Sequence, residues 1–392
     1  MFLQGIKVLD LTHVQAGPTC TAMLADLGAD VIKVESFAGD QFRQPLEGAN
    51  FWNFNRNKRG IALNLRADQG REIALRLAQK SDVLVENFLP GSIDRLGLGY
   101  EIISQLNPRI VYCSISGYGQ CGPFRERPAY EPVLQAMSGI MDCTGEEGGL
   151  PVRVRPAMID YCTAANAAFA IVVCLLNREK TGKGQRIDMA LLDVAIFAMA
   201  PYVTQYKKKG ELPERSGSAQ PWAGASQNFE AKDGLIHIVA GTDNMFRNLC
   251  AALNRDDLAN DPRYATRDAR AKHRKELVEI INRETRKYSK WELEKKLLMA
   301  DVACSVVRNV GEIIEELHVQ KRGILEENEI PKMGKITTIK TPPSVALGFP
   351  IPPRFRAPML GEHTEEILSE IGYSSHEINK FLDQGVVLKY NC

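Results

Sequence analysis

Several residue patterns that identify common enzyme classes are missing from this sequence. Its six histidines include no pair four positions apart and no H-E-x-x-H, so they do not indicate a metal site. Its nine cysteines are scattered without C-x-x-C spacing, which argues against zinc and against a disulfide framework and favours a reducing, cytoplasmic environment. Residues 1–4 lack the basic region and apolar core of a signal peptide.

An excess of charge of one sign and long apolar runs are missing as well. Lys and Arg number 49 against 48 Asp and Glu, which favours neither nucleic acid nor a membrane as a partner. The longest apolar run, 167–176, is shorter than the roughly 20 residues of a membrane span and predicts a buried helix. The 392 residues, 44% hydrophobic and 25% charged, are typical of a soluble protein with two or three domains.

The chain opens with a strand, a turn, a helix and a second strand. Apolar residues predict strands at 6–11 and 31–34, and a helix at 19–27 ends at Gly28. The turn after the first strand of such a unit lies at the carboxyl edge of the sheet, where anionic ligands bind. It reads Gln15-Ala16-Gly17-Pro18 instead of G-x-G-x-x-G, so NAD is not expected, although Glu35 stands where a ribose-binding acid would.

Strands and helices continue to alternate, which predicts an α/β fold with a largely parallel, doubly wound sheet. Residues 1–206 form the first part of a large domain, in which two helices, 162–178 and 189–206, come last. A linker rich in Lys, Gly, Pro and Ser covers 207–224, and a smaller α+β domain covers 225–325. In the tail, 326–392, a capping box at Ser374 and Glu377 predicts the start of a helix.

Asp160 stands directly before a helix of small and apolar residues. At this position it is expected to be the N-cap, whose carboxylate accepts hydrogen bonds from free N–H groups. The small residues after it also leave space beside the carboxylate, as a covalent or ligand-facing acid requires. The residues alone leave both interpretations open.

A series of motifs resembles the family III coenzyme A transferases, which include the formyl-CoA:oxalate and carnitine CoA-transferases. The resemblance runs nearly from end to end, with the motifs in the order of the family. They stand at 14–18, 30–35, 57–59, 85–88, 90–91, 116–119, 178–185, 361–364 and 371–374.

The resemblance implies both an architecture and an assembly. The N-terminal half and the C-terminal tail would form a large domain with a Rossmann-like core, and the small domain would lie between them. Each protomer would be a ring, and two rings would interlock as a homodimer.

The resemblance also implies a reaction. Asp160 would attack the thioester of an acyl-CoA donor to give a mixed anhydride, and CoA would return to give an aspartyl-CoA thioester. A small carboxylic acid acceptor would then reverse these steps. The amide of Gln15 would donate to the oxyanion, and its alternative role is to cap the turn. CoA is carried as a substrate, and no metal or permanently bound cofactor is expected.

The family pattern assigns a set of residues to CoA. Arg66 and Arg95 suit phosphates, and Phe88 suits the adenine or the pantetheine arm. Ser36 and Pro128 depart from the formyl-CoA transferase, which has Arg and Lys there, so Arg43 or Arg127 is expected to replace a phosphate contact. The assigned residues are Gln15, Ala16, Leu63, Asn64, Arg66, Asn87, Phe88, Arg95, Tyr130 and Glu131.

Other functions remain alternatives. An α-methylacyl-CoA racemase needs a histidine beside its Asp, and residues 127–132 contain none. A non-catalytic CoA-binding subunit of a hetero-oligomeric transferase is disfavoured because both Asp160 and Gln15 are present. The region 220–226, which includes Trp222, differs from the glycine-rich loop for oxalate and is closer to the carnitine enzyme. The donor, the acceptor and pairing with a paralogous chain stay open.

Overall fold

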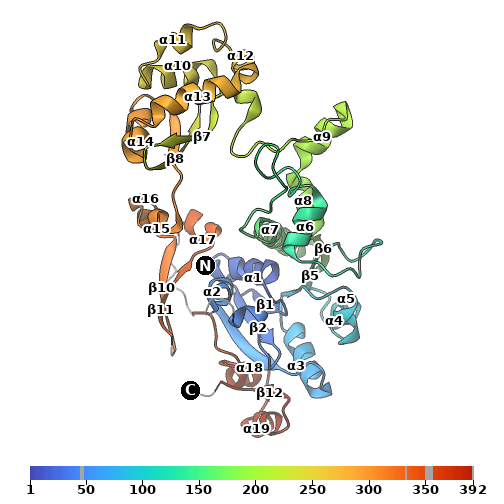
Figure 1. Ribbon diagram of the computed structural model, residues 1–392. Helices are drawn as coiled ribbons and strands as arrows, with labels where there is room; N and C mark the ends of the chain where they lie inside the picture. Colours follow the sequence, from blue (N-terminus) through green and yellow to red (C-terminus); the bar gives the residue numbers. More distant parts are fainter. Residues whose placement is uncertain (45–47, 332, 349–355, 391–392) are drawn as a thin grey trace. The chain divides into compact units, whose positions relative to one another are not determined.

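The computed structural model describes residues 1–44, 48–331, 333–348 and 356–390. The chain divides into two compact units, coloured along the sequence in Figure 1. The first comprises Met1–Ile140, Arg153–Lys207 and His318–Cys392, and the second comprises Met141–Val152 and Lys208–Leu317. The C-terminal stretch therefore belongs to the same unit as the N-terminal half.

A seven-stranded sheet forms the centre of the first unit, in the order β12-β3-β2-β1-β4-β5-β6. All neighbouring strands are parallel except β12, which is antiparallel to β3. The order β3-β2-β1-β4-β5-β6 is that of a Rossmann sheet, so the predicted parallel α/β core is confirmed. The strands are β1 Lys7–Asp10, β2 Asp30–Glu35, β3 Lys58–Leu63, β4 Val83–Glu86, β5 Val111–Ser116, β6 Gln185–Ala190 and β12 Val387–Leu388.

Helices cover both faces of this sheet. Successive strand residues point to opposite faces, so Leu9 joins a core with α3, α5, α18 and α19, whereas Val8 joins one with α1, α6 and α7. Burial on both faces explains the near-continuous apolar strands of the sequence. The helices are α1 Ala16–Asp26, α2 Ala49–Phe54, α3 Asp68–Gln79, α4 Ser92–Arg95, α5 Tyr100–Leu106, α6 Glu131–Ser138, α7 Met158–Thr181, α8 Leu191–Ala198, α9 Ala200–Lys209, α16 Leu317–Arg322, α17 Pro342–Ala346, α18 Thr364–Glu370 and α19 Ser375–Asp383, with the 3-10 turn η1 Gln41–Arg43.

Two segments differ from the sequence prediction. The helix expected from residue 189 is preceded by strand β6, and α8 and α9 follow it. The pattern of β6 is hard to recognise because it is an edge strand, in which Ile187 and Ala190 are buried between exposed polar residues. A hairpin of β10 (Leu325–Ile330) and β11 (Gly334–Ile339) occupies part of the predicted tail. The capping box at Ser374 is confirmed at the start of α19.

Helix α7 is not buried on all sides, contrary to the prediction for 167–176. Ala164, Ala167 and Ile171 lie in the core, whereas Phe169 is 71% and Leu176 65% exposed. This helix of 24 residues is long and apolar enough to cross a membrane by length and composition alone. Because one face packs in the core with α1 and β5, we regard it as a core helix with an uncovered apolar stripe.

The second unit is a smaller α+β structure. Its antiparallel sheet has the order β7-β8-β9, with strands Ser226–Ala231, Gly234–Val239 and Ala303–Val306. Phe229, Ile236 and Leu249 lie in its core. Residues 208–224 of the predicted linker 207–224 also belong to this unit, as do 141–152. The unit ends at Leu317 rather than at the predicted residue 325. Its helices are α10 Asp243–Ala252, α11 Asp256–Asn260, α12 Arg267–Lys272, α13 Arg274–Thr285, α14 Lys290–Met299 and α15 Val310–Ile314, with the 3-10 turn η3 Pro221–Ala223.

Candidate active site

The turn between β1 and α1 is held by side chains rather than by a backbone ladder. The N–H of Thr12 donates to Asp10 Oδ1 at 2.9 Å. Asn87, which follows β4, accepts from the His13 N–H at 2.9 Å and donates to its carbonyl at 2.8 Å. Asn87 was assigned to CoA from the resemblance, and in the structure its amide group also fixes this turn.

Gln15 directly precedes α1 and is 8% exposed. Its carbonyl accepts the N–H of Thr19 at 2.9 Å, so the helix begins at Ala16, three residues earlier than predicted. In the described structure the Gln15 side chain makes no capping hydrogen bond to α1. Its amide therefore does not cap α1.

Two lysines and Asp10 are fully buried beneath this turn. Lys58 Nζ lies 2.9 Å from Asp10 Oδ2, and each side chain is 0% exposed. Burial opposes the ionisation of Asp10, but Lys58 and Lys33 together with bonds from Thr12 and Thr21 hold its pKa below the usual range. Burial lowers the pKa of Lys58 to about 8 despite the opposing effect of Asp10. These charges connect the carboxyl end of β1 with Lys33 inside β2 and with Lys58 at the start of β3.

Asp160 occupies the first turn of α7, and the N-cap is Ala157. The prediction that Asp160 caps the helix is wrong because the helix starts at Met158, so Asp160 is its third residue. Burial raises the pKa of Asp160 to about 7, and the negative charge of Glu131 adds to the effect. A carboxyl group with a raised pKa binds its proton more tightly than an exposed one does. Such perturbed groups are typical of functional sites.

Glu131 is the first residue of α6 and is 6% exposed. Gln135 Nε2 donates to Glu131 Oε1 at 2.7 Å and to the Val154 carbonyl at 2.9 Å, and Gln135 Oε1 accepts the Val154 N–H at 2.8 Å. Gln135 thus ties the segment that leads into α7 to the acid beside Asp160. Sequence reasoning did not identify Gln135, because only the fold brings residues 135 and 154 together.

A cavity of about 860 Å³ opens at the carboxyl ends of β1, β2 and β3. Arg66 and Arg95 line it, together with Ser36, a departure from the formyl-CoA transferase pattern. Its volume lies in the range of cofactor-sized ligand sites. Five of the residues assigned to CoA line it, namely Leu63, Asn64, Arg66, Phe88 and Arg95.

A second cavity, of about 220 Å³, lies beside the first. Asn87 and Tyr130 line it from the assigned set, and Arg127 adds a cation. His13 and Phe88 line both cavities, with ring centroids 5.5 Å apart. His13 was missed in the sequence, although its place just after a strand at the carboxyl edge could have indicated it; burial lowers its pKa.

The remaining candidates lie elsewhere. Gln15, Ala16, Glu131 and Asp160 do not line these two cavities in the described structure. Of the two arginines expected as alternatives for the phosphate contact, Arg43 lines neither of these cavities, and its Nε and Nη2 bind the two oxygens of Glu35, at 2.8 and 2.6 Å. Among residues 1–44, 48–331, 333–348 and 356–390, no group of three acidic, His or Cys side chains is arranged to hold a metal.

Comparisons with known proteins agree in one family. Residues 3–364 match CoA-transferase family III. The chain is 38% identical to human succinyl-CoA:glutarate CoA-transferase, over 98% of this chain and 90% of the relative. It is 35% identical to formyl-CoA:oxalate CoA-transferase of Escherichia coli O157:H7, over 96% and 97% of the two chains. A crystal structure of a CAIB/BAIF family protein from Brucella suis is 36% identical, with a TM-score of 0.84 over 94% of this chain and 99% of that one.

Proposed function

The chain belongs to CoA-transferase family III, and from that premise we propose that it moves CoA from an acyl-CoA donor to a carboxylic acid through Asp160. The observation that carries the proposal is the environment of this carboxyl group in the first turn of α7. Burial and Glu131 raise its pKa to about 7, which favours a reactive carboxylate over a solvated surface acid.

The reaction balances with Asp160 as the only covalent group. Its carboxylate attacks the donor thioester carbonyl, the C–S bond breaks, and CoA leaves as a thiolate, so that a mixed anhydride of Asp160 and the donor acid remains. The thiolate attacks the aspartyl carbonyl, which releases the donor acid and leaves an aspartyl-CoA thioester. The acceptor carboxylate then attacks this thioester and displaces the CoA thiolate, which gives a mixed anhydride of Asp160 and the acceptor. The thiolate attacks the acceptor carbonyl of this anhydride, which forms the acceptor-CoA product and releases the Asp160 carboxylate. Each step exchanges one acyl bond for another.

Each attack places negative charge on a carbonyl oxygen. We assign the amide of Gln15 as a hydrogen-bond donor to this oxygen, because Gln15 is buried and its side chain does not cap α1. A fixed neutral donor stabilises an oxyanion without a proton transfer.

We assign CoA to the two cavities that share His13 and Phe88. Arg66 and Arg95 would bind the phosphates in the larger cavity, because guanidinium groups match phosphate oxygens. The rings of His13 and Phe88, between the two cavities, would contact the pantetheine arm. These assignments involve only side chains of the first unit.

For the substrates, we propose a dicarboxylic acid acceptor and a short acyl-CoA donor such as succinyl-CoA. The names of the relatives, which specify succinyl-CoA, glutarate and oxalate, support this class. In the second unit Trp222 is 61% exposed and lines a cavity of about 570 Å³ with Thr242 and Arg267. We propose that this region, 220–226, selects the acceptor.

We further propose an interlocked homodimer of ring-shaped protomers, located in the cytoplasm. The exposed stripe on α7, formed by Phe169, Val173 and Leu176, supports a second copy as the covering surface. Apolar residues at this spacing lie on one face of a helix, and a large exposed patch of this kind marks an interaction site.

The proposal can be tested with purified protein and a panel of acyl-CoA donors and carboxylic acids. Initial rates of CoA exchange should depend on both a donor and an acceptor. Hydroxylamine should trap Asp160 as a hydroxamate after incubation with the donor alone, and peptide mass spectrometry would locate it. Transfer without any modification of Asp160 would contradict the mechanism.

A further inference from the structure

Val14 has a backbone conformation that its side chain disfavours. Its φ is 68°, and the other non-glycine residues with positive φ in the described chain are Asn57, Asn254 and Asp301. Asn and Asp tolerate this region, whereas a β-branched residue in it is an outlier. Such strain persists only where the surroundings hold it, and it is common at functional sites. Val14 directly precedes Gln15.

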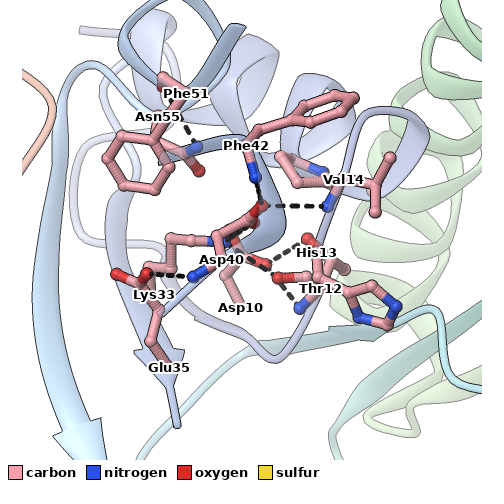
Figure 2. Close-up of polar contacts among 12 residues, drawn as sticks. Asp10, Thr12, His13, Val14, Lys33, Glu35, Asp40, Phe42, Phe51 and Asn55 are labelled. Carbon is pink, nitrogen blue, oxygen red and sulfur yellow. Dashed lines mark hydrogen bonds and ion pairs between the residues drawn. The ribbon is translucent and has the colours of Figure 1, made fainter. Parts of the chain in front are cut away.

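Two buried side chains, Asp40 and Lys33, bind the backbone of Val14 and of Thr12, two residues before it. The N–H of Val14 donates to Asp40 Oδ1 at 3.4 Å. Lys33 Nζ donates to the Thr12 carbonyl at 2.8 Å and lies 3.1 Å from Asp40 Oδ2, so one ion pair contacts the turn on both sides of His13 (Figure 2). The side chains of Lys33 and Asp40 are 0% and 1% exposed.

Asp40 is itself fixed to the sheet. Its N–H donates to Glu35 Oε2 at 2.9 Å, at the end of β2. Its Oδ1 also accepts the N–H of Phe42 at 2.9 Å as the N-cap of η1. The bidentate bonds from Arg43 keep Glu35 in place. Asp40 therefore joins the rigid end of β2 to the strained turn after β1 (Figure 2).

We propose that Asp40 is a positioning residue that, with Lys33, holds Val14 in the left-handed conformation and thereby aims the side chain of Gln15. This inference rests on the proposed function, because Gln15 is the group that would contact the oxyanion. Without Asp40, Val14 can relax to negative φ, which rotates the next peptide and moves the amide of Gln15 away from the reacting carbonyl. Asp40 also lines the larger cavity, but its side chain is only 1% exposed and the phosphates are assigned to Arg66 and Arg95, so CoA binding should be largely spared.

A double-mutant cycle tests this inference. Asp40→Ala should lower kcat by about tenfold and change KM for the acyl-CoA by less than about twofold. In the Gln15→Ala background the same change should lower kcat by less than about twofold, because Asp40 acts through Gln15. Val14→Asn should restore most of the kcat of Asp40→Ala, since Asn adopts positive φ more readily. If Asp40→Ala does not fold, Asp40→Asn replaces it in the cycle.

Asp30→Asn is the matched control, because Asp30 is an ion-paired carboxylate at the opposite end of β2. It should leave kcat unchanged. Equal losses from Asp40→Ala in both backgrounds, or a full kcat in Gln15→Ala, would overturn the positioning role.

A structural readout separates this inference from the proposed function. A crystal structure of the Asp40 variant should have Val14 at negative φ. Val14 remaining at positive φ would refute the role of Asp40 even if the wild type transfers CoA. Wild-type protein that transfers no CoA would instead refute the proposed function, and the conformation of Val14 would still decide whether Asp40 holds the turn.

Discussion

The substitution Asp160→Asn should abolish transfer and at the same time stabilise the protein. An amide cannot form the anhydride or the aspartyl-CoA thioester, so kcat should fall by several orders of magnitude. The gain in stability follows from burial, because the asparagine side chain is neutral at every pH. The two effects separate the role of Asp160 in chemistry from its role in the fold.

The size of the stability gain can be worked from the environment of Asp160. Its pKa rises from 3.8 to about 7, and each pKa unit corresponds to about 1.4 kcal/mol. The ionised carboxylate thus costs at most about 4 kcal/mol of the free energy of unfolding at pH 8. Asp160 is partly exposed, and solvent screening reduces the expected gain to about 1–2 kcal/mol.

The gain should depend on pH with a definite sign. A carboxyl group whose pKa is raised by folding binds its proton more tightly in the folded state, so stability falls as pH rises from the unfolded to the folded pKa. The difference between Asp160→Asn and wild type should be small near pH 4, grow between pH 4 and 7, and stay constant above that. Urea unfolding at fixed protein concentration measures it.

Asp193→Asn is the matched control, since Asp193 is an exposed acid at the third position of α8. It should leave both stability and turnover close to wild type. Equal stability of Asp160→Asn and wild type at pH 8 would refute the burial argument. Substantial turnover of the folded variant, after mass spectrometry has excluded deamidation, would refute the nucleophile assignment.

Four further predictions concern binding, pH and assembly. Because ionised Asp160 is the nucleophile, kcat/KM should rise with pH up to about 7 and then level off, and a rate that falls over this range would contradict the assignment. Arg66→Gln should raise KM for the acyl-CoA by about tenfold with little change in kcat, as expected for loss of a charged contact; an unchanged KM would remove Arg66 from the CoA site. Trp222→Ala should change the ranking of acceptors more than the KM for CoA donors, which a matrix of initial rates measures, and an unchanged ranking would contradict it. Leu176→Lys should disrupt the homodimer, which analytical ultracentrifugation measures. A wild-type dimer that dissociates on dilution into monomers with native far-UV circular dichroism would contradict the interlocked assembly.

Strands β1, β2, β4 and β5 could be predicted because each is a short apolar run inside the sheet. Strand β6 could not, because an edge strand buries only Ile187 and Ala190 among polar residues. The start of α7 was misplaced for a local reason. Asp favours the N-cap position, but α7 begins two residues before Asp160, at Met158.

The candidate site was predicted in part. Motifs along the sequence indicated Arg66, Arg95 and Phe88, which the structure brings to one cavity. Asp40 and Gln135 were not indicated, because their roles depend on partners that only the fold supplies. Arg43 and Arg127 were alternatives for a phosphate contact, and only the structure shows that Arg43 is paired with Glu35 whereas Arg127 lines a cavity.

The sequence by itself determined the parallel α/β core, the family and the identity of the candidate nucleophile. These features depend on local periodicity and on motifs whose residues are close along the chain. Only the tertiary structure decided how the candidate groups are tuned and held. Burial beside Glu131 raises the pKa of Asp160, and Asp40 contacts Val14 from the segment between β2 and η1. Desolvation and contacts between distant segments arise only when the chain has packed, so no local pattern encodes them.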